Sequence, residues 1–299
     1  MRILVGVDGS TASRIACDFV ASRTWQTGTR IRLLGALEPR MDWTGLAPVP
    51  NDASDTERAI LTEVLDERVN AFAGRPFAIE PVIEAGRAAD LLMAEAAEWF
   101  ADLIVVGNRG LGAAASAVLG SVSAHLVDHA PCPVLVARSP SASRMLIAAD
   151  GTPSSRNIPS ILAAWGTAFR GLPVEVLSVA HHEDGTVPEA VLEEDDRRDL
   201  AMHREIAQQV AREMSDLGWT AEALTRGGDP GRLIVAPGRE WGADLIVTGS
   251  RGLGTLRRFV LGSVAHDVLL HARSSVLVMR GQVPAEIREP ARAANPALP

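Results

Sequence analysis

The strongest constraint in this sequence is a long segment that occurs twice. One copy of a glycine-rich run starts at Gly107 (GNRGLG) and the other starts at Gly249 (GSRGLG). The opening runs RILVGVDGS and RMLIAADGT repeat with the same spacing. Asp150 follows Asp8 by as many residues as Gly249 follows Gly107. A spacing that is unchanged at both ends of the unit predicts two copies of one domain in tandem.

Within each copy, apolar runs typical of strands alternate with helical patterns. The expected strands are 3–8, 30–37, 77–84, 103–107 and 133–137, then 145–150, 174–180, 220–224, 245–249 and 275–279. The expected helices are 10–26, 54–72, 88–100 and 119–130, then 154–169, 188–217, 233–241 and 261–271. Helical crossovers between strands predict a parallel sheet, and the fully apolar runs LIVVG and LIVTG are typical of strands covered on both faces. The predicted fold class is α/β, with two tandem, doubly wound, five-stranded parallel sheets of Rossmann-like type.

The chain length agrees with two domains, since 299 residues suit two units of about 150 each. We expect the first domain at residues 1–139 and the second at 144–281, divided by the Ser- and Pro-rich stretch RSPSASR. The tail 282–299 is rich in Ala, Pro and charge, and is expected to be disordered.

Composition excludes several kinds of function. The sequence contains no Lys, so a Walker P-loop and Schiff-base chemistry are both excluded. A net charge of −8 argues against nucleic acid as a partner. No long apolar run is free of charge, which argues against a membrane partner, and the chain opens on a strand rather than a signal peptide. We therefore expect a cytoplasmic protein. Cys17 and Cys132 lack metal-ligand spacing, and no metal site is expected.

Ligands of an open parallel sheet bind beyond the carboxyl ends of its strands. Asp8 and Asp150 end the first strand of each copy and should face that edge. Asp102 and Asp244 precede the fourth strand and should lie at the opposite edge, which excludes a Walker-B role.

A glycine-rich loop follows the fourth strand of each copy and leads into a Gly-Ser pair at the start of a helix. Its candidate ligand-binding residues are Gly107, Arg109, Gly110, Gly112, Gly120 and Ser121 in the first copy, and Gly249, Arg251, Gly252, Gly254, Gly262 and Ser263 in the second. Glycine permits close backbone approach to a ligand, and helix N-termini suit phosphate groups. The alternative is structural: glycines that make a tight turn and a Gly-Ser pair that only starts a helix.

Both loops fit the pattern G-x2-G-x9-G-[S/T] and resemble the ATP-binding branch of the universal stress protein family. The resemblance covers nearly the whole chain and includes the Asp-Gly pairs that end in Gly9 and Gly151. It implies that Asp8 and Asp150 lie on the adenine side of a bound nucleotide, and that the backbones of Ala36 and Val179 contact adenine. The loop glycines would then follow the ribose and phosphates, the Gly-Ser pairs would hold phosphate oxygens, and Mg²⁺ could bridge the phosphates.

Two features of this resemblance bear on assembly and on the first site. The apolar edge runs VLVAR and SVLVMR need cover, so we expect the fifth strands of the two copies to form a pseudo-dimer within one chain, with a homodimer as a further option. In the first copy, Gly35 and Ala36 stand where the family usually has larger residues, which favours the second site.

The predicted function is an ATP-binding universal stress protein that acts as a regulatory or sensing module, with an unknown protein partner that reads its nucleotide state. No residue set is evident for catalysis, so no catalytic residue is assigned, and at most weak ATP hydrolysis is expected. Two alternatives stay open: a slow ATPase or phosphoryl-transfer enzyme that uses the same loops, and a nucleotide-free scaffold.

Overall fold

The computed structural model describes residues 1–38, 53–110, 119–181, 194–250 and 261–280. The first half contains β1 (Arg2–Val7), α1 (Thr11–Ala21), β2 (Arg30–Leu37), α2 (Ala53–Ala71), β3 (Ala78–Ala85), α3 (Ala88–Glu98), β4 (Leu103–Gly107), α4 (Ser121–His129) and β5 (Val134–Ala137). The second half contains β6 (Met145–Ala148), α5 (Pro153–Arg156), α6 (Ile158–Ala164), β7 (Val174–His181), α7 (Glu194–Asp216), β8 (Ala221–Gly228), α8 (Pro230–Glu240), β9 (Leu245–Gly249), α9 (Ser263–His271) and β10 (Ser275–Met279).

All these strands form one ten-stranded sheet in the order β3-β2-β1-β4-β5-β10-β9-β6-β7-β8. Within each half the strands pair in parallel, as the crossover helices require. The halves join through β5 and β10, which pair antiparallel with Leu135 opposite Leu277. The predicted α/β fold with two tandem units is confirmed, and the fifth strands do cover each other's edges, so the two five-stranded sheets are continuous.

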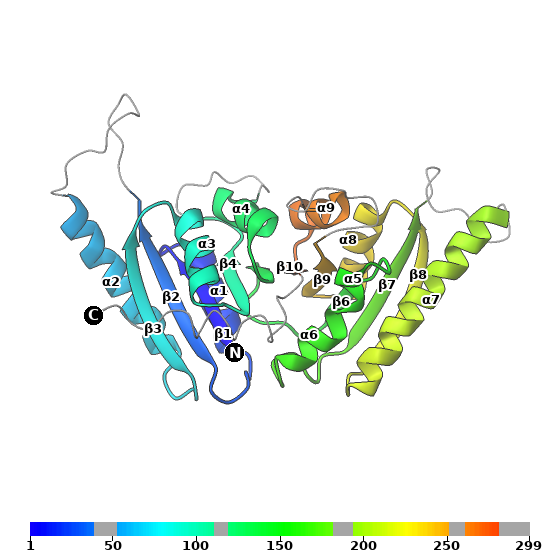
Figure 1. Cartoon of the computed structure of the whole chain (residues 1–299), viewed down its shortest axis with the longest axis horizontal. Coiled ribbons are helices and arrows are strands. Elements are labelled where there is room, and N and C mark those ends of the chain that lie inside the picture. The colour runs from blue at the N-terminus through cyan, green and yellow to red at the C-terminus, as the bar shows by residue number, and fades with distance from the viewer. Residues whose placement is uncertain (39–52, 111–118, 182–193, 251–260, 281–299) are drawn as a thin grey trace, which may run out of the picture.

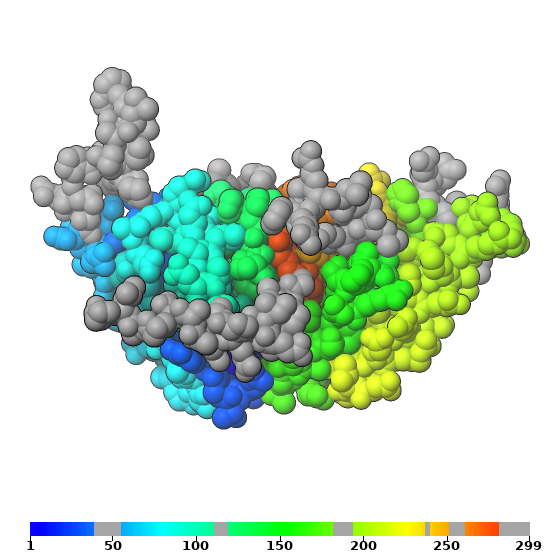
Figure 2. All heavy atoms as spheres, in the orientation of Figure 1, coloured from blue at the N-terminus to red at the C-terminus, as the bar shows by residue number. Residues whose placement is uncertain are grey.

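Helices cover both faces of the sheet in each half, so the apolar strands are buried on both sides. One core contains Phe19 of α1 and Leu65 of α2 together with Met214 of α7. The other contains Leu126 of α4 and Leu269 of α9. Figure 1 shows α2 and α7 at opposite ends of the molecule and α4 and α9 near its middle. In the space-filling view, green atoms of the first half contact orange atoms of the second at the centre (Figure 2).

The predicted single helix at 154–169 was wrong, because the structure has two short helices there. α5 ends at Arg156 and α6 starts at Ile158, with Pro159 in its first turn. Proline has no N–H to donate to the carbonyl four residues earlier, and its ring clashes with that carbonyl, so the first helix cannot continue. Elsewhere the expected elements are present with shifted ends, such as β8, which extends to Gly228.

Some expectations concern residues outside the described ranges, including the loop at 39–52, the start of the helix expected from 188, and the tail. Among the helices that the structure describes, none is both long and apolar enough to cross a membrane.

Candidate functional site

A cavity of about 710 Å³ lies in the first half, at the carboxyl ends of β1, β2 and β4. Its volume is within the range typical of small-molecule sites. The cavity brings together, from four separate segments, most of the first-copy candidates: Asp8, Ala36, Gly107, Arg109, Gly110, Gly120 and Ser121. The predicted location at the carboxyl edge of the sheet is where this cavity is found.

Both apolar and polar groups line the cavity. Ile60, Leu61 and Val64 line it from α2, and Leu92 lines it from α3. Such a surface suits a flat, weakly polar group such as a nucleobase. Arg109 and the start of α4 also line the cavity, where they offer positive charge and N–H groups to an anion.

The Asp8 carboxylate spans the edge between β1 and the loop after β4. Its Oδ1 accepts a hydrogen bond from the Ser10 N–H at 3.0 Å, which fixes the turn. Its Oδ2 faces the loop so closely that a Cβ on Gly110 would lie 2.6 Å away. In the second half, Oδ1 of Asp150 accepts in the same way from the Thr152 N–H at 3.0 Å. The two predicted Asp residues therefore hold equivalent turns.

The glycines after these Asp residues are required by the backbone. Gly9 has φ +80° and Gly151 has φ +76°, a left-handed conformation that side chains disfavour. Both positions therefore have a structural reason for glycine in addition to any contact with a ligand.

The first glycine of each loop lies close to a neighbouring helix. A Cβ on Gly107 would lie 2.5 Å from the carbonyl carbon of Ala12 in α1. A Cβ on Gly249 would lie 2.8 Å from Oγ of Ser154 in α5. The structural alternative raised from the sequence thus accounts for Gly107, which meets backbone, more fully than for Gly249, which meets a hydroxyl, although Gly107 also borders the cavity.

The helices that follow the two loops start without a side-chain cap. The Gly120 N–H donates to the Asn108 carbonyl at 2.8 Å, and the Gly262 N–H donates to the Ser250 carbonyl at 2.9 Å, so each helix start is tied to its own loop. No described side chain caps α4 or α9. The N–H groups of the first turn are orphan donors of the helix, and a phosphate is a suitable acceptor for them.

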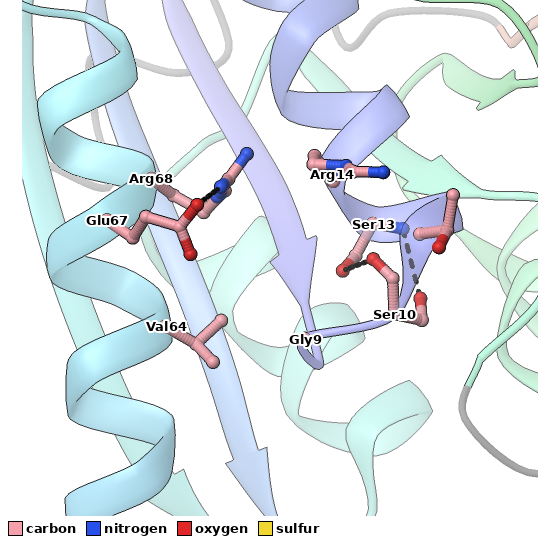
Figure 3. Close-up of a pocket in the computed structure, with 8 residues that line it drawn as sticks. Gly9, Ser10, Ser13, Arg14, Val64, Glu67 and Arg68 are labelled. Atoms are coloured by element: carbon pink, nitrogen blue, oxygen red, sulfur yellow. Dashed lines mark hydrogen bonds and ion pairs between the residues drawn. The ribbon is translucent and has the colours of Figure 1, made fainter.

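A smaller pocket of about 150 Å³ adjoins the cavity between α1 and α2 and shares Ser13 and Val64 with it. Arg14 and Arg68 reach into this pocket from the two helices (Figure 3). Arg68 pairs with Glu67 beside it, so much of its charge is balanced. The pocket is therefore a polar extension of the cavity, in which Arg14 supplies positive charge.

The two halves differ in the side chain that packs against the second strand, which comes from α2 in the first half and from α7 in the second. In the first half, Leu61 packs against Gly35, where a Cβ would be only 2.8 Å away. In the second half, Ser178 Oγ lies 2.7 Å from Nδ1 of His203 on α7, and Nε2 lies 3.9 Å from Asp199. This Ser-His-Asp set was not foreseen from the sequence. Because Ser178 is fully buried, it does not present a nucleophile to substrate.

The remaining second-copy candidates lie at the matching edge of their own half. Val179 is on β7 and is buried, whereas its counterpart Ala36 is partly exposed. Ser263 starts α9 and is exposed. Gly112, Arg251, Gly252 and Gly254 lie outside the described residues, so their predicted roles stay predictions, as does the stronger second site. The described residues contain no cluster of His, Cys, Asp or Glu suited to a metal ion.

The family model for universal stress proteins matches this sequence twice, at residues 1–138 and 142–280. The chain belongs to the universal stress protein family. A universal stress protein of Mycobacterium tuberculosis is 29% identical to it over 301 residues, which cover 94% of this chain and 96% of the relative. One from Thermus aquaticus is 35% identical over 136 residues, 46% of this chain and 97% of the relative.

Solved structures give the same fold. The crystal structure of a universal stress protein from Archaeoglobus fulgidus superposes with a TM-score of 0.66 at 19% identity. The superposition covers 94% of this chain and 96% of that one. The match extends over both halves of this family member, in agreement with the tandem architecture.

Proposed function

We propose that this universal stress protein binds ATP in the first-half cavity and acts as a regulatory module whose state depends on nucleotide. The observation that carries this proposal is the convergence of an apolar wall, Arg109 and the uncapped start of α4 on one cavity of about 710 Å³. Adenine would pack against the α2 wall beside the Ala36 backbone. The triphosphate would extend toward Gly120 and Ser121, with Mg²⁺ bridging its oxygens.

The second half is proposed to hold a nucleotide at the equivalent edge, between the Asp150 turn and the start of α9. Binding to the folded chain alone would stabilise it in proportion to nucleotide concentration. A protein partner could read that change if it prefers one state.

A proline substitution offers a sharp test of the phosphate contact. Ser121 is the first residue of α4, and Gly120 before it has φ −68° and ψ 154°, a conformation that tolerates a following proline. Ser121→Pro should keep the helix while deleting one N–H that faces the cavity. Loss of one charge-assisted hydrogen bond of about 1.5–3 kcal/mol predicts ATP affinity reduced by about tenfold or more.

Ser121→Ala is the matched control, because it removes the hydroxyl and keeps the N–H. Isothermal titration calorimetry with ATP should show a larger loss for the proline variant than for the alanine variant. Equal affinities in the unaltered chain and in Ser121→Pro would refute the phosphate site.

Two measurements separate this proposal from its alternatives. Mass spectrometry of freshly purified, denatured protein should release adenine nucleotide, whereas empty protein that also fails to bind added ATP would favour the scaffold. Quenching a single-turnover mixture should return ATP unchanged. Conversion to ADP that Ser121→Pro abolishes would establish the slow ATPase instead.

A further inference from the structure

Two arginines cross the junction between the halves and bind the ends of helices on the far side. Arg138 follows β5 of the first half, and its guanidinium donates to the Leu269 carbonyl in α9 and, at 3.2 Å, to the Ser274 carbonyl. Arg280 follows β10 of the second half and donates to the Val127 carbonyl in α4 at 2.6 Å and to the Ala130 carbonyl at 3.2 Å.

The two contacts are equivalent by the internal repeat. Arg138 and Arg280 are separated by the same number of residues as the two copies of the repeat, and so are their acceptors Val127 and Leu269. Each arginine therefore supplies the other half with donors for helix-end carbonyls that have no partner within the helix. A cation at a helix C-terminus also interacts favourably with the helix dipole.

The opposite ends of the same helices are the proposed phosphate sites. α4 has 9 residues, from Ser121 to His129, and is about 13 Å long. α9 likewise has 9 residues, from Ser263 to His271. Helices this short depend on tertiary contacts at both ends, because their own hydrogen bonds scarcely exceed the cost of nucleation. Figure 1 shows both helices beside the junction.

Resting on the proposed nucleotide site, we propose that Arg280 is a positioning residue for the first-half site and that Arg138 is a positioning residue for the second-half site. Each arginine holds the C-terminal turn of a helix and thereby keeps its N-terminal N–H groups aligned on phosphate. Each site is thus completed by a residue of the other half.

Charge near the first site also acts on Arg138. Burial lowers the pKa of Arg138 to about 10, and the positive charge of Arg109 contributes to the same shift. At neutral pH Arg138 stays protonated despite this shift, so it remains able to hold α9 through its charge.

The test uses the full chain with Arg280→Met and Arg138→Met, and the exposed Arg273→Met as the control for loss of one charge nearby. Without nucleotide, amide hydrogen exchange should rise in the last turn of α4 for Arg280→Met and in the last turn of α9 for Arg138→Met. Arg280→Lys should partly restore protection, because it keeps the charge but loses the two-pronged geometry.

ATP titrations then separate the two sites. Ser263→Pro disables the second site by the logic of Ser121→Pro, because Gly262 has φ −66° and ψ 150°. In that background Arg280→Met should lower ATP affinity by about threefold to tenfold, and Arg138→Met should leave it unchanged. In the Ser121→Pro background the roles should reverse.

The modes of failure are distinguishable. No ATP binding by the unaltered chain refutes the nucleotide site itself, and with it the positioning role. If the unaltered chain binds ATP but the two Arg→Met variants lose the same affinity in both backgrounds, or lose none, the positioning role alone is overturned. Equal losses would indicate general destabilisation, and an equal shift in thermal midpoint would accompany them.

Discussion

Gly107 offers a direct way to separate packing from ligand binding in the loop after β4. A Cβ at this position would lie 2.5 Å from the carbonyl carbon of Ala12 and 2.6 Å from both its Cβ and its carbonyl oxygen. These atoms belong to the backbone and short side chain of α1, which is anchored in the core by Phe19. They cannot move aside without shifting the helix, so the clash is not relieved by a rotamer change.

Gly107→Ala should therefore destabilise the protein by about 3 kcal/mol, at the upper end of the usual cost of overpacking. Gly110→Ala provides the contrast, because its Cβ would meet only the terminal Asp8 Oδ2 at 2.6 Å. A carboxylate can rotate, so we expect a loss of stability below about 1 kcal/mol there. Gly6→Ala should lie between the two, since its Cβ would meet the ends of Leu92 and Val106 at 3.1 and 3.2 Å.

Urea unfolding followed by circular dichroism and tryptophan fluorescence would give the three stabilities. ATP affinity should show a different order, with Gly110→Ala strongly affected despite its stability. If Gly107→Ala were as stable as the unaltered chain, the close contact with α1 would not be what requires glycine. If Gly110→Ala bound ATP normally, the loop would not approach the nucleotide at that residue.

Three further predictions concern buried groups. Burial raises the pKa of Cys17 to about 12, so the stability that this thiol contributes is present below about pH 8.5 and is lost between there and pH 12. Cys17→Ala should therefore reduce, by one proton, the slope with which the free energy of unfolding in urea falls with pH in this alkaline range. His203→Leu should cost about 1–3 kcal/mol by leaving Ser178 Oγ without this partner, and adding Ser178→Gly should recover most of it in a double-mutant cycle. Arg32, mostly buried, bridges Glu80 and Glu95, so Arg32→Met should lower the free energy of unfolding by about 3 kcal/mol, and a thermal midpoint unchanged by it would contradict the ion-pair argument.

The tandem fold was predictable because duplication leaves a direct record in the sequence. The step from Asp8 to Asp150 equals the step from Gly107 to Gly249, which defines two equal units without any knowledge of packing. The carboxyl-edge rule then placed the first-copy candidates at the edge where the cavity is found, since it depends only on strand direction. Apolar run length was enough to place the strands, and Pro159 was the local signal that the prediction of one helix overlooked.

What the sequence did not reveal depends on contacts between distant residues. Ser178 and His203 are 25 residues apart, and their pairing requires α7 to pack on β7 in one rotation. The packing role of Gly107 likewise depends on how closely α1 approaches β4. A glycine motif fits both close packing and close approach to a ligand, so the sequence alone could not separate the two explanations.

The internal comparison of the two halves indicates which features serve the assembly and which distinguish the sites. Arg138 and Arg280 have the same residue type and equivalent acceptors, as a symmetric junction requires, since a defect on either side would free a helix end. The residues that α2 and α7 pack against the second strand of each half are different, with Leu61 against Gly35 in the first half and His203 bonded to Ser178 in the second. The chain thus combines a shared frame, in which each half holds the end of a helix in the other, with two halves whose packing beside the carboxyl edge is not the same.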